Sequence, residues 1–305
     1  MTRTTSAQMD TMLARKGADA QTRARCIYLA LRDGTSIGIT DHDQDLVIDL
    51  DFISDVPITF RADTGVMPSD ISLSVGLNAD NMEISGPLTD LITRAAVLGK
   101  RFNRATVKVF DIDWERQTDS SANDILKLLA GNIADARIQG GSFVFEVRSY
   151  TDRFNQTIGR LLTPYCDADF GDARCGKNRE DIAAEVTAVT DDFRFTLDLA
   201  GTYANDYFNL GTLEFLTGEL AGTEEVEVFD YVGASSAVTI LAPLPQAPAI
   251  GDTLVIRRGC SKLKKSDDAT LPTCHSYDNV INFRGFDRVP GSDQYLKVAV
   301  PGQGN

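Results

Sequence analysis

The stretches TPYCDADFGDARCG at residues 163–176 and IRRGCSKLKKSDDATLPTCHS at residues 256–276 contain four of the five cysteines of this chain. Eight residues separate Cys166 from Cys175, thirteen separate Cys260 from Cys274, and 84 lie between the two pairs. A folded module in that interval would bring the pairs together if its two ends met. Cysteines gathered in this way hold a metal or a cluster, or they form disulfides.

The spacing alone leaves the chemistry of these cysteines open. A zinc ribbon has C-x-x-C knuckles, which neither pair shows. Iron–sulfur clusters also take four cysteines, and their ligand spacing is freer. Glycines beside the cysteines would let backbone N–H groups approach sulfur, and basic side chains would offset a thiolate-bound cluster; these residues are Gly171, Gly176, Gly259, Arg174, Arg257, Arg258 and Lys262. Two disulfides, or four ordinary small apolar residues, are the alternatives.

The composition is that of an ordinary soluble protein, and 305 residues suffice for two or three domains. A net charge of −14 argues against a surface that binds phosphate backbones, because such binding requires Lys and Arg. The N-terminus has no apolar region typical of a secretory signal, and no apolar run is long enough to span a bilayer. The fifth cysteine, Cys26, lies in a strand-like stretch and is expected in the core. An odd number of cysteines without an export signal fits reduced thiols made in a cytoplasm.

Strand patterns dominate the first half of the chain. CIYLALRDG and TSIGIT predict a hairpin that turns at Asp33-Gly34, and ATVKVFDIDW at residues 105–114 predicts a further strand. Helices are expected at residues 7–20, at residues 88–99 with Gly99 at the end, and at residues 151–162.

The interval between the cysteine pairs predicts a small barrel or sandwich. Its six short strands are expected at residues 184–190, 193–199, 211–218, 225–233, 237–242 and 252–258. The predicted fold class is therefore mainly β with a few short helices, multi-domain, with β-barrel or sandwich modules and a four-cysteine C-terminal cluster domain. Residues 1–150 are expected to form a β-rich domain, 151–182 a helix with the first cysteine pair, and 183–258 the small β-barrel. Residues 259–305 are expected to carry the second pair and to pack on residues 151–182.

Two other candidate sites have simpler explanations. TDHDQDL places Asp41, Asp43 and Asp45 at alternate positions, but a calcium loop requires Gly where this chain has Leu46 and an acidic residue where it has Phe52. A hairpin end held by side-chain hydrogen bonds is the preferred interpretation. The chain has only two histidines, His42 and His275, and His275 is expected to be a neighbour of the cysteine site and not a ligand. Nucleotide-binding, serine hydrolase and zinc protease motifs are all missing.

Several segments together resemble the tail hub, or baseplate hub, proteins of siphophages and of phage-derived gene transfer agents. These segments are GITDHDQDL (38–46), LNADNMEISG (77–86), FEVRSYTDRFNQTIGRLLTPYCDADFGDARCG (145–176), IGDTLVIRRGC (250–260) and NVINFRGFDRVPGSD (279–293). They follow the order of the family and cover most of the chain. The cysteine stretch and NFRGF are the most specific. One departure is local, since the family has Pro-His or a similar pair where this chain has Asp287-Arg288.

The resemblance implies a non-enzymatic structural protein of the virion, made in the host bacterial cytoplasm and located at the tail tip or baseplate. It implies a homotrimeric ring, with residues 1–150 as its hub domain, that joins the distal tail protein to the tail tip or central fibre protein. The ring would surround the channel for the tape measure protein and for DNA in transit. It also implies that Cys166, Cys175, Cys260 and Cys274 hold an iron–sulfur cluster, most simply 4Fe-4S, with zinc as the alternative. The cluster would act as a structural staple.

Two other function classes compete with this interpretation. An iron–sulfur oxidoreductase would require a second cofactor site or a substrate pocket, and no motif for either is found. A cell-wall-degrading tip enzyme would require a nucleophile with its base, but the two histidines lie in a turn and beside a candidate ligand.

Overall fold

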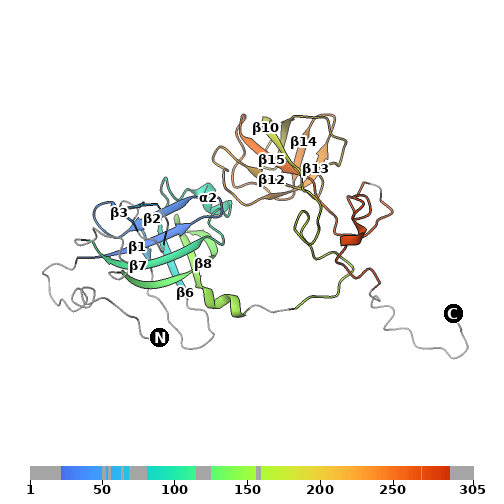
Figure 1. Ribbon diagram of the computed structural model, residues 1–305. Helices are drawn as coiled ribbons and strands as arrows, with labels where there is room; N and C mark the ends of the chain where they lie inside the picture. The colour runs from blue at the N-terminus through green and yellow to red at the C-terminus, as the bar shows by residue number, and fades with distance from the viewer. Residues whose placement is uncertain are drawn as a thin grey trace, which may run out of the picture. The chain divides into compact units, whose positions relative to one another are not determined.

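The computed structural model describes residues 22–49, 53, 56–62, 65–68, 81–114, 125–155, 159–268 and 270–288. The helix expected at residues 7–20 lies outside them. The chain divides into two compact units (Figure 1). The first comprises residues 1–157 with 222–224, and the second comprises residues 158–221 and 225–305.

The first unit is built on a nine-stranded sheet. All neighbouring strands are antiparallel except β2 and β4, which are parallel. In spatial order the strands are β3 (Leu46–Ile48), β4 (Ile58–Arg61), β2 (Ser36–Thr40), β1 (Arg23–Ala30), β7 (Thr106–Asp113), β8 (Ile125–Gln139), β9 (Ser142–Ser149), β6 (Asn81–Pro87) and β5 (Met67–Pro68). The predicted hairpin at Asp33-Gly34 is confirmed as the connection between β1 and β2.

Strand β1 shows why this sheet is stable. Ile27 and Leu29 enter one apolar cluster, whereas Cys26 and Tyr28 enter another on the opposite face. Since side chains alternate along a strand, both faces of the sheet are covered here. Cys26 has 0% exposed surface, which confirms it as a core residue.

The helical predictions in this part of the chain were too long. Helix α2 covers only Arg94–Leu98, with the Thr93 side chain accepting a hydrogen bond from the N–H of Ala96 and with Gly99 at its end. The expected helix at 151–162 is wrong. A 3-10 helix, η2 (Tyr150–Asn155), takes its place, and residues 159–162 are not helical. Leu161 and Leu162 have no core to cover and are strongly exposed, so periodicity alone does not hold a helix there.

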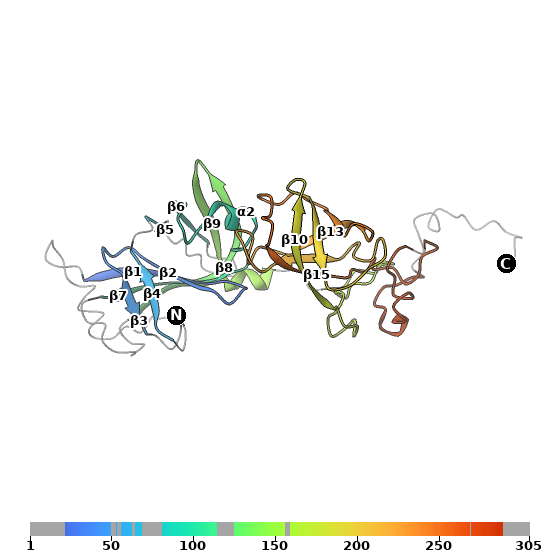
Figure 2. The same cartoon turned by 90° about the horizontal axis from the view of Figure 1, so that it is seen from above.

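The second unit contains a closed six-stranded barrel, which confirms a β-barrel in this interval (Figure 2). Its strands follow the order β10 (Asp181–Val189), β11 (Arg194–Leu199), β14 (Ala237–Ile240), β13 (Val226–Val232), β12 (Thr212–Phe215) and β15 (Thr253–Arg257). Phe195, Leu213, Val228 and Leu254 fill the interior and are at most 2% exposed. A short 3-10 helix, η3 (Val280–Asn282), follows in the C-terminal part. No helix in the described part of the chain is both long and apolar enough to cross a membrane.

Candidate functional site

The barrel explains why cysteines 84 residues apart can meet. Strands β10 and β15 pair in antiparallel orientation, with Asp181 opposite Arg257. The chain enters the barrel and leaves it at the same point of its wall. Cys175 lies shortly before Asp181 and Cys260 shortly after Arg257, so both cysteine-bearing segments start from one edge of the barrel.

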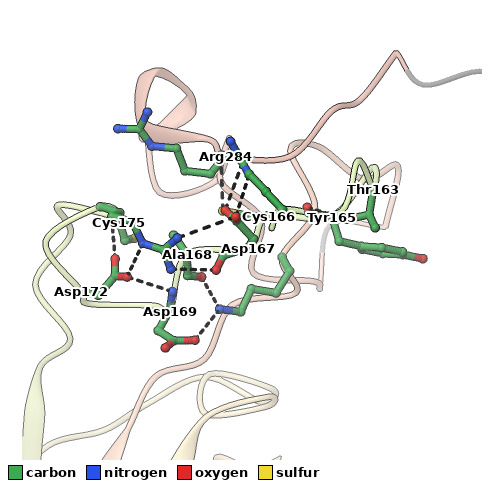
Figure 3. A network of polar contacts seen from close by, with 12 residues as sticks. Thr163, Tyr165, Cys166, Asp167, Ala168, Asp169, Asp172, Cys175 and Arg284 are labelled. Atoms are coloured by element: carbon green, nitrogen blue, oxygen red, sulfur yellow. Dashed lines mark hydrogen bonds and ion pairs between the residues drawn. The ribbon is translucent and has the colours of Figure 1, made fainter. Parts of the chain in front are cut away.

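The two segments contact each other directly. The N–H of Cys166 donates to the carbonyl oxygen of Lys262 across 2.8 Å. The Lys262 ammonium in turn donates to the carbonyl oxygen of the buried Ala168. Further along, the N–H of Phe286 donates to the carbonyl oxygen of Thr163 at 2.8 Å. Figure 3 shows Thr163, Cys166, Ala168, Cys175 and Arg284 in this network. We call the region around Cys166, Cys175, Cys260 and Cys274 the cysteine corner.

Three nitrogen donors point at sulfur in the cysteine corner. The backbone N–H of Lys262 lies 3.4 Å from Cys260 Sγ, and the N–H of Arg284 lies 3.4 Å from Cys166 Sγ. The side-chain Nδ2 of Asn279 lies 3.5 Å from Cys175 Sγ. Such donors stabilise negative charge on sulfur, so the surroundings suit thiolates.

The neighbouring cysteines affect the pKa values of Cys274 and Cys260. The pKa of Cys274 is raised to about 11, mainly by burial and in smaller part by the nearby Cys260, Cys166 and Cys175. Burial likewise raises the pKa of Cys260, although the N–H and the charge of Lys262 act in the opposite direction. Four thiolates this close to each other would repel, so a bound cation would be needed to keep them all deprotonated.

Asp172 shapes the loop that carries the first cysteine pair. Its Oδ1 accepts a hydrogen bond of 2.6 Å from the N–H of Cys175. Its Oδ2 accepts one of 3.2 Å from the N–H of Asp169 and contacts Arg174 Nε at 3.2 Å. These contacts, also drawn in Figure 3, lower the pKa of Asp172 below its ordinary value, with the Cys175 N–H as the main cause. The loop is closed by the N–H of Gly176, which donates to the Asp172 carbonyl oxygen.

Arg258 connects the barrel to the cysteine corner. Its guanidinium lies between the rings of Tyr207 and Tyr277, 4.2 Å and 4.8 Å from their centroids. The Tyr277 hydroxyl donates to the carbonyl oxygen of Gly259 at 2.7 Å. Burial raises the pKa of Tyr277 to about 12, so this hydroxyl keeps its proton as a donor. The residues directly before Cys260 are therefore held by the barrel side and by the C-terminal segment together.

The structure corrects part of the expected charge pattern. Arg257 does not face the thiols, because it pairs with Asp181, Glu214 and Glu225 on the barrel. Arg174 pairs with aspartates of its own loop. The expected approach of glycine N–H groups to sulfur is wrong for Gly176, and the backbone donors belong to Lys262 and Arg284 instead.

Asn279, Asp172 and Tyr277 are the residues that sequence reasoning missed. None of them belongs to a metal-ligand motif that the sequence would reveal, because each supports the site through a hydrogen bond to a neighbouring backbone or sulfur atom. The segment at residues 41–45 is not the end of a hairpin, because β4 lies between β2 and β3 in the sheet. The expected side-chain hydrogen bonds of its aspartates are confirmed. Asp41 accepts from the N–H of Arg25 and Asp45 from the N–H of Ala62.

The donor set of the cysteine corner consists of free thiols and of N–H groups directed at three of them. All five cysteines lie among the described residues and are free thiols, so no disulfide joins them. Within the described ranges, no three His, Cys, Asp or Glu side chains are arranged to hold a single metal ion. Thiols with N–H donors directed at sulfur are ligands of the kind that both iron–sulfur clusters and zinc sites use, so the donor chemistry fits either group.

Comparison with known proteins identifies the class of this chain. Residues 6–178, more than half of the chain, match the family model described as the baseplate hub protein, N-terminal attachment domain. Residues 206–293 match the family described as phage conserved hypothetical protein BR0599. A search of curated proteins returned no match.

A solved structure extends the similarity to the whole chain. One chain of a structure described as the virion of a native gene transfer agent particle is 27% identical, with a TM-score of 0.75. The alignment covers 98% of each chain. The protein described here belongs to the baseplate hub family of phages and gene transfer agents, and it is a component of the virion tail.

Proposed function

We propose that the protein is a non-enzymatic hub that forms a homotrimeric ring at the distal end of the tail. The ring joins the distal tail protein to the tail tip or central fibre protein. It surrounds the channel through which the tape measure protein and then DNA leave. The full-length similarity to a virion chain supports this role, and the net charge of −14 suits a wall that DNA passes without adhering.

The ring is tested by its location and its stoichiometry. Antibody labelling of purified particles is expected to mark the tail tip, and labelling of the head alone would contradict the proposal. Analytical ultracentrifugation of the purified chain, mixed with its distal tail protein, is expected to give three hub chains per complex. A hub that remains monomeric in that mixture would argue against the trimer.

The proposed function includes a 4Fe-4S cluster held by Cys166, Cys175, Cys260 and Cys274. The observation that carries this proposal is the convergence of two distant cysteine pairs with three N–H donors directed at sulfur. The cluster would supply a covalent connection between the segment before the barrel and the segment after it. Because ligands from both segments are required, binding would favour the folded arrangement of the C-terminal residues.

The first test is the content of iron, zinc and acid-labile sulfide per chain, on protein purified without oxygen. Iron with matching sulfide is the expected result. Zinc without sulfide would keep a structural staple but replace its chemistry. The absence of both iron and zinc would overturn the cluster proposal. The hub assignment would then rest on the family match.

A further inference from the structure

The side chain of Asn279 connects the two cysteine-bearing segments of the cysteine corner. Asn279 is 5% exposed, and it comes from the C-terminal segment. Its Nδ2 donates to the carbonyl oxygen of Cys175 at 2.8 Å and lies 3.5 Å from Cys175 Sγ. A buried amide therefore joins the second cysteine-bearing segment to a cysteine of the first.

The same residue also contacts the other cysteine pair. The backbone N–H of Asn279 donates to the carbonyl oxygen of Cys274 at 2.9 Å. Its carbonyl oxygen accepts from Cys274 Sγ at 3.2 Å. Binding of a metal group removes the Cys274 proton, and this last bond is lost with it. The Nδ2 contact to Cys175 needs no thiol proton, so it persists in the metal-bound state.

The orientation of the amide is fixed by a third residue. Asn282 Nδ2 donates to Asn279 Oδ1 at 2.8 Å, so the oxygen of Asn279 faces Asn282 and its nitrogen faces Cys175. Asn282 in turn lies against Gly176, where a Cβ atom would approach its Nδ2 to 3.1 Å. The left-handed φ of Gly176, +68°, and this close approach both favour glycine directly after Cys175.

We infer that Asn279 is a positioning residue that sets the stability and the reduction potential of the group bound at Cys175. This inference rests on the proposed cluster. A donor on a ligating sulfur stabilises the reduced, more negative state, so its loss lowers the reduction potential. Its loss also leaves the partly buried carbonyl of Cys175 without this partner.

The inference is tested by Asn279→Asp and Asn279→Leu in the full chain purified without oxygen. Asp keeps the shape but places a carboxylate against the Cys175 carbonyl and sulfur, whereas Leu removes the donor without adding charge. Both variants are expected to lose iron to a chelator about 10-fold faster or more, in line with the usual effect of changing a residue that supports a metal ligand. Asn279→Leu is also expected to have a lower reduction potential than the wild type.

The matched control is Asn178→Asp, which adds the same charge three residues after Cys175 at an exposed position. Its chelation rate and potential are expected to stay near those of the wild type. If Asn279→Asp fails to assemble, Asn282→Leu provides the second variant, because it frees the orientation of the Asn279 amide without touching a cysteine. Its potential is expected to fall between those of Asn279→Leu and the wild type.

The possible failures are distinguishable. Wild-type protein without iron and sulfide would remove the cluster proposal itself. Wild-type protein with a cluster, but Asn279→Leu and Asn282→Leu with unchanged potential and chelation rate, would overturn the positioning role alone. A thermal shift in these variants without a change in potential would also overturn it, since a purely structural residue would give that result.

Discussion

The N–H of Cys166 and the carbonyl oxygen of Lys262 are joined by a hydrogen bond of 2.8 Å, which connects the two cysteine-bearing segments without any metal. Together with the pairing of Phe286 and Thr163, this bond gives the cysteine corner a protein framework of its own. The barrel has a separate apolar core. Loss of the proposed cluster is therefore expected to loosen the corner while the barrel remains folded.

Replacement of one proposed ligand distinguishes the stability of the cysteine corner from that of the barrel. Cys175→Ala is expected to abolish the cluster and to destabilise the segment around residues 259–288, because both pairs are needed to bind the group. Iron and sulfide analysis, combined with calorimetry of the full chain, measures both effects. Full metal content and an unchanged melting profile would contradict the assignment.

Cys26→Ala is the control for this experiment. Cys26 is fully buried in the first unit, and burial raises the pKa of its thiol to about 12, so it remains a neutral core residue. The substitution is expected to reduce the stability of the first unit and to leave iron and sulfide unaltered. Loss of metal in this variant would mean that the wrong four thiols were assigned.

The Asp172 carboxylate is expected to control how well the first cysteine pair is presented. Asp172→Asn exchanges one carboxylate oxygen for an amide group that cannot accept a hydrogen bond, so the N–H groups of Cys175 and Asp169 cannot both be satisfied. A reduced iron content and faster chelation are expected. Asp267→Asn removes the same charge from an exposed position of the second cysteine-bearing segment and is expected to change neither. Equal iron content in both variants would show that the loop does not depend on Asp172.

The barrel core gives a test of the fold that is independent of metal. Leu213 is 0% exposed on β12, and Leu213→Ala is expected to lower the free energy of unfolding of the barrel by about 2–5 kcal/mol. Leu241→Ala, at a position that is 60% exposed, is expected to lower it by less than about 0.5 kcal/mol. Urea denaturation followed by circular dichroism measures both. Similar losses in the two variants would contradict the inward orientation of Leu213.

The sequence predicted the barrel well because its signals are local. Alternating residues such as those of FRFTLDL at 193–199 bury every second side chain, and that period is visible without a structure. The meeting of the cysteine pairs was predicted conditionally, from the need for the barrel ends to lie together. The pairing of β10 with β15 provides that meeting.

The sequence named Arg258 and Lys262 among the supporting residues, but it could not separate them from Arg257, for a physical reason. Arg257 and Lys262 have the same charge and lie three and two residues from Cys260 in the chain. Only the Lys262 side chain enters the cysteine corner, where it donates to the Ala168 carbonyl oxygen, whereas Arg257 pairs with Asp181 on the barrel. The direction of a side chain at the end of a strand depends on pleat and twist, which a spacing count does not contain. The helix expected at 151–162 was wrong because periodicity predicts a helix only where a tertiary surface covers its apolar face.

The ion pairs of Glu225 with Arg179 and Arg257 predict that the stability of the barrel depends on pH in the acid range. Glu225 accepts hydrogen bonds from Arg179 and Thr212 and also pairs with Arg257. Burial alone would raise the pKa of Glu225, but the Arg179 and Thr212 hydrogen bonds and the two positive charges outweigh it, so the pKa lies below its ordinary value of 4.5. The stabilisation is therefore fully present above pH 4.5 and is lost as the pH falls through the lowered native pKa.

Glu225→Gln is expected to lower the Tm of the barrel at pH 7 and to flatten its decline between about pH 5 and pH 3. The effect at pH 7 is expected to be modest, at about 1 kcal/mol or less, because Glu225 is 39% exposed and solvent screens the pairs. Glu219→Gln, at an exposed position, is the control and is expected to follow the wild-type curve. Since acid removes any bound cluster from all three proteins alike, the difference between their curves reports Glu225 itself. A Glu225→Gln curve parallel to that of the wild type from pH 7 to pH 3 would contradict the lowered pKa.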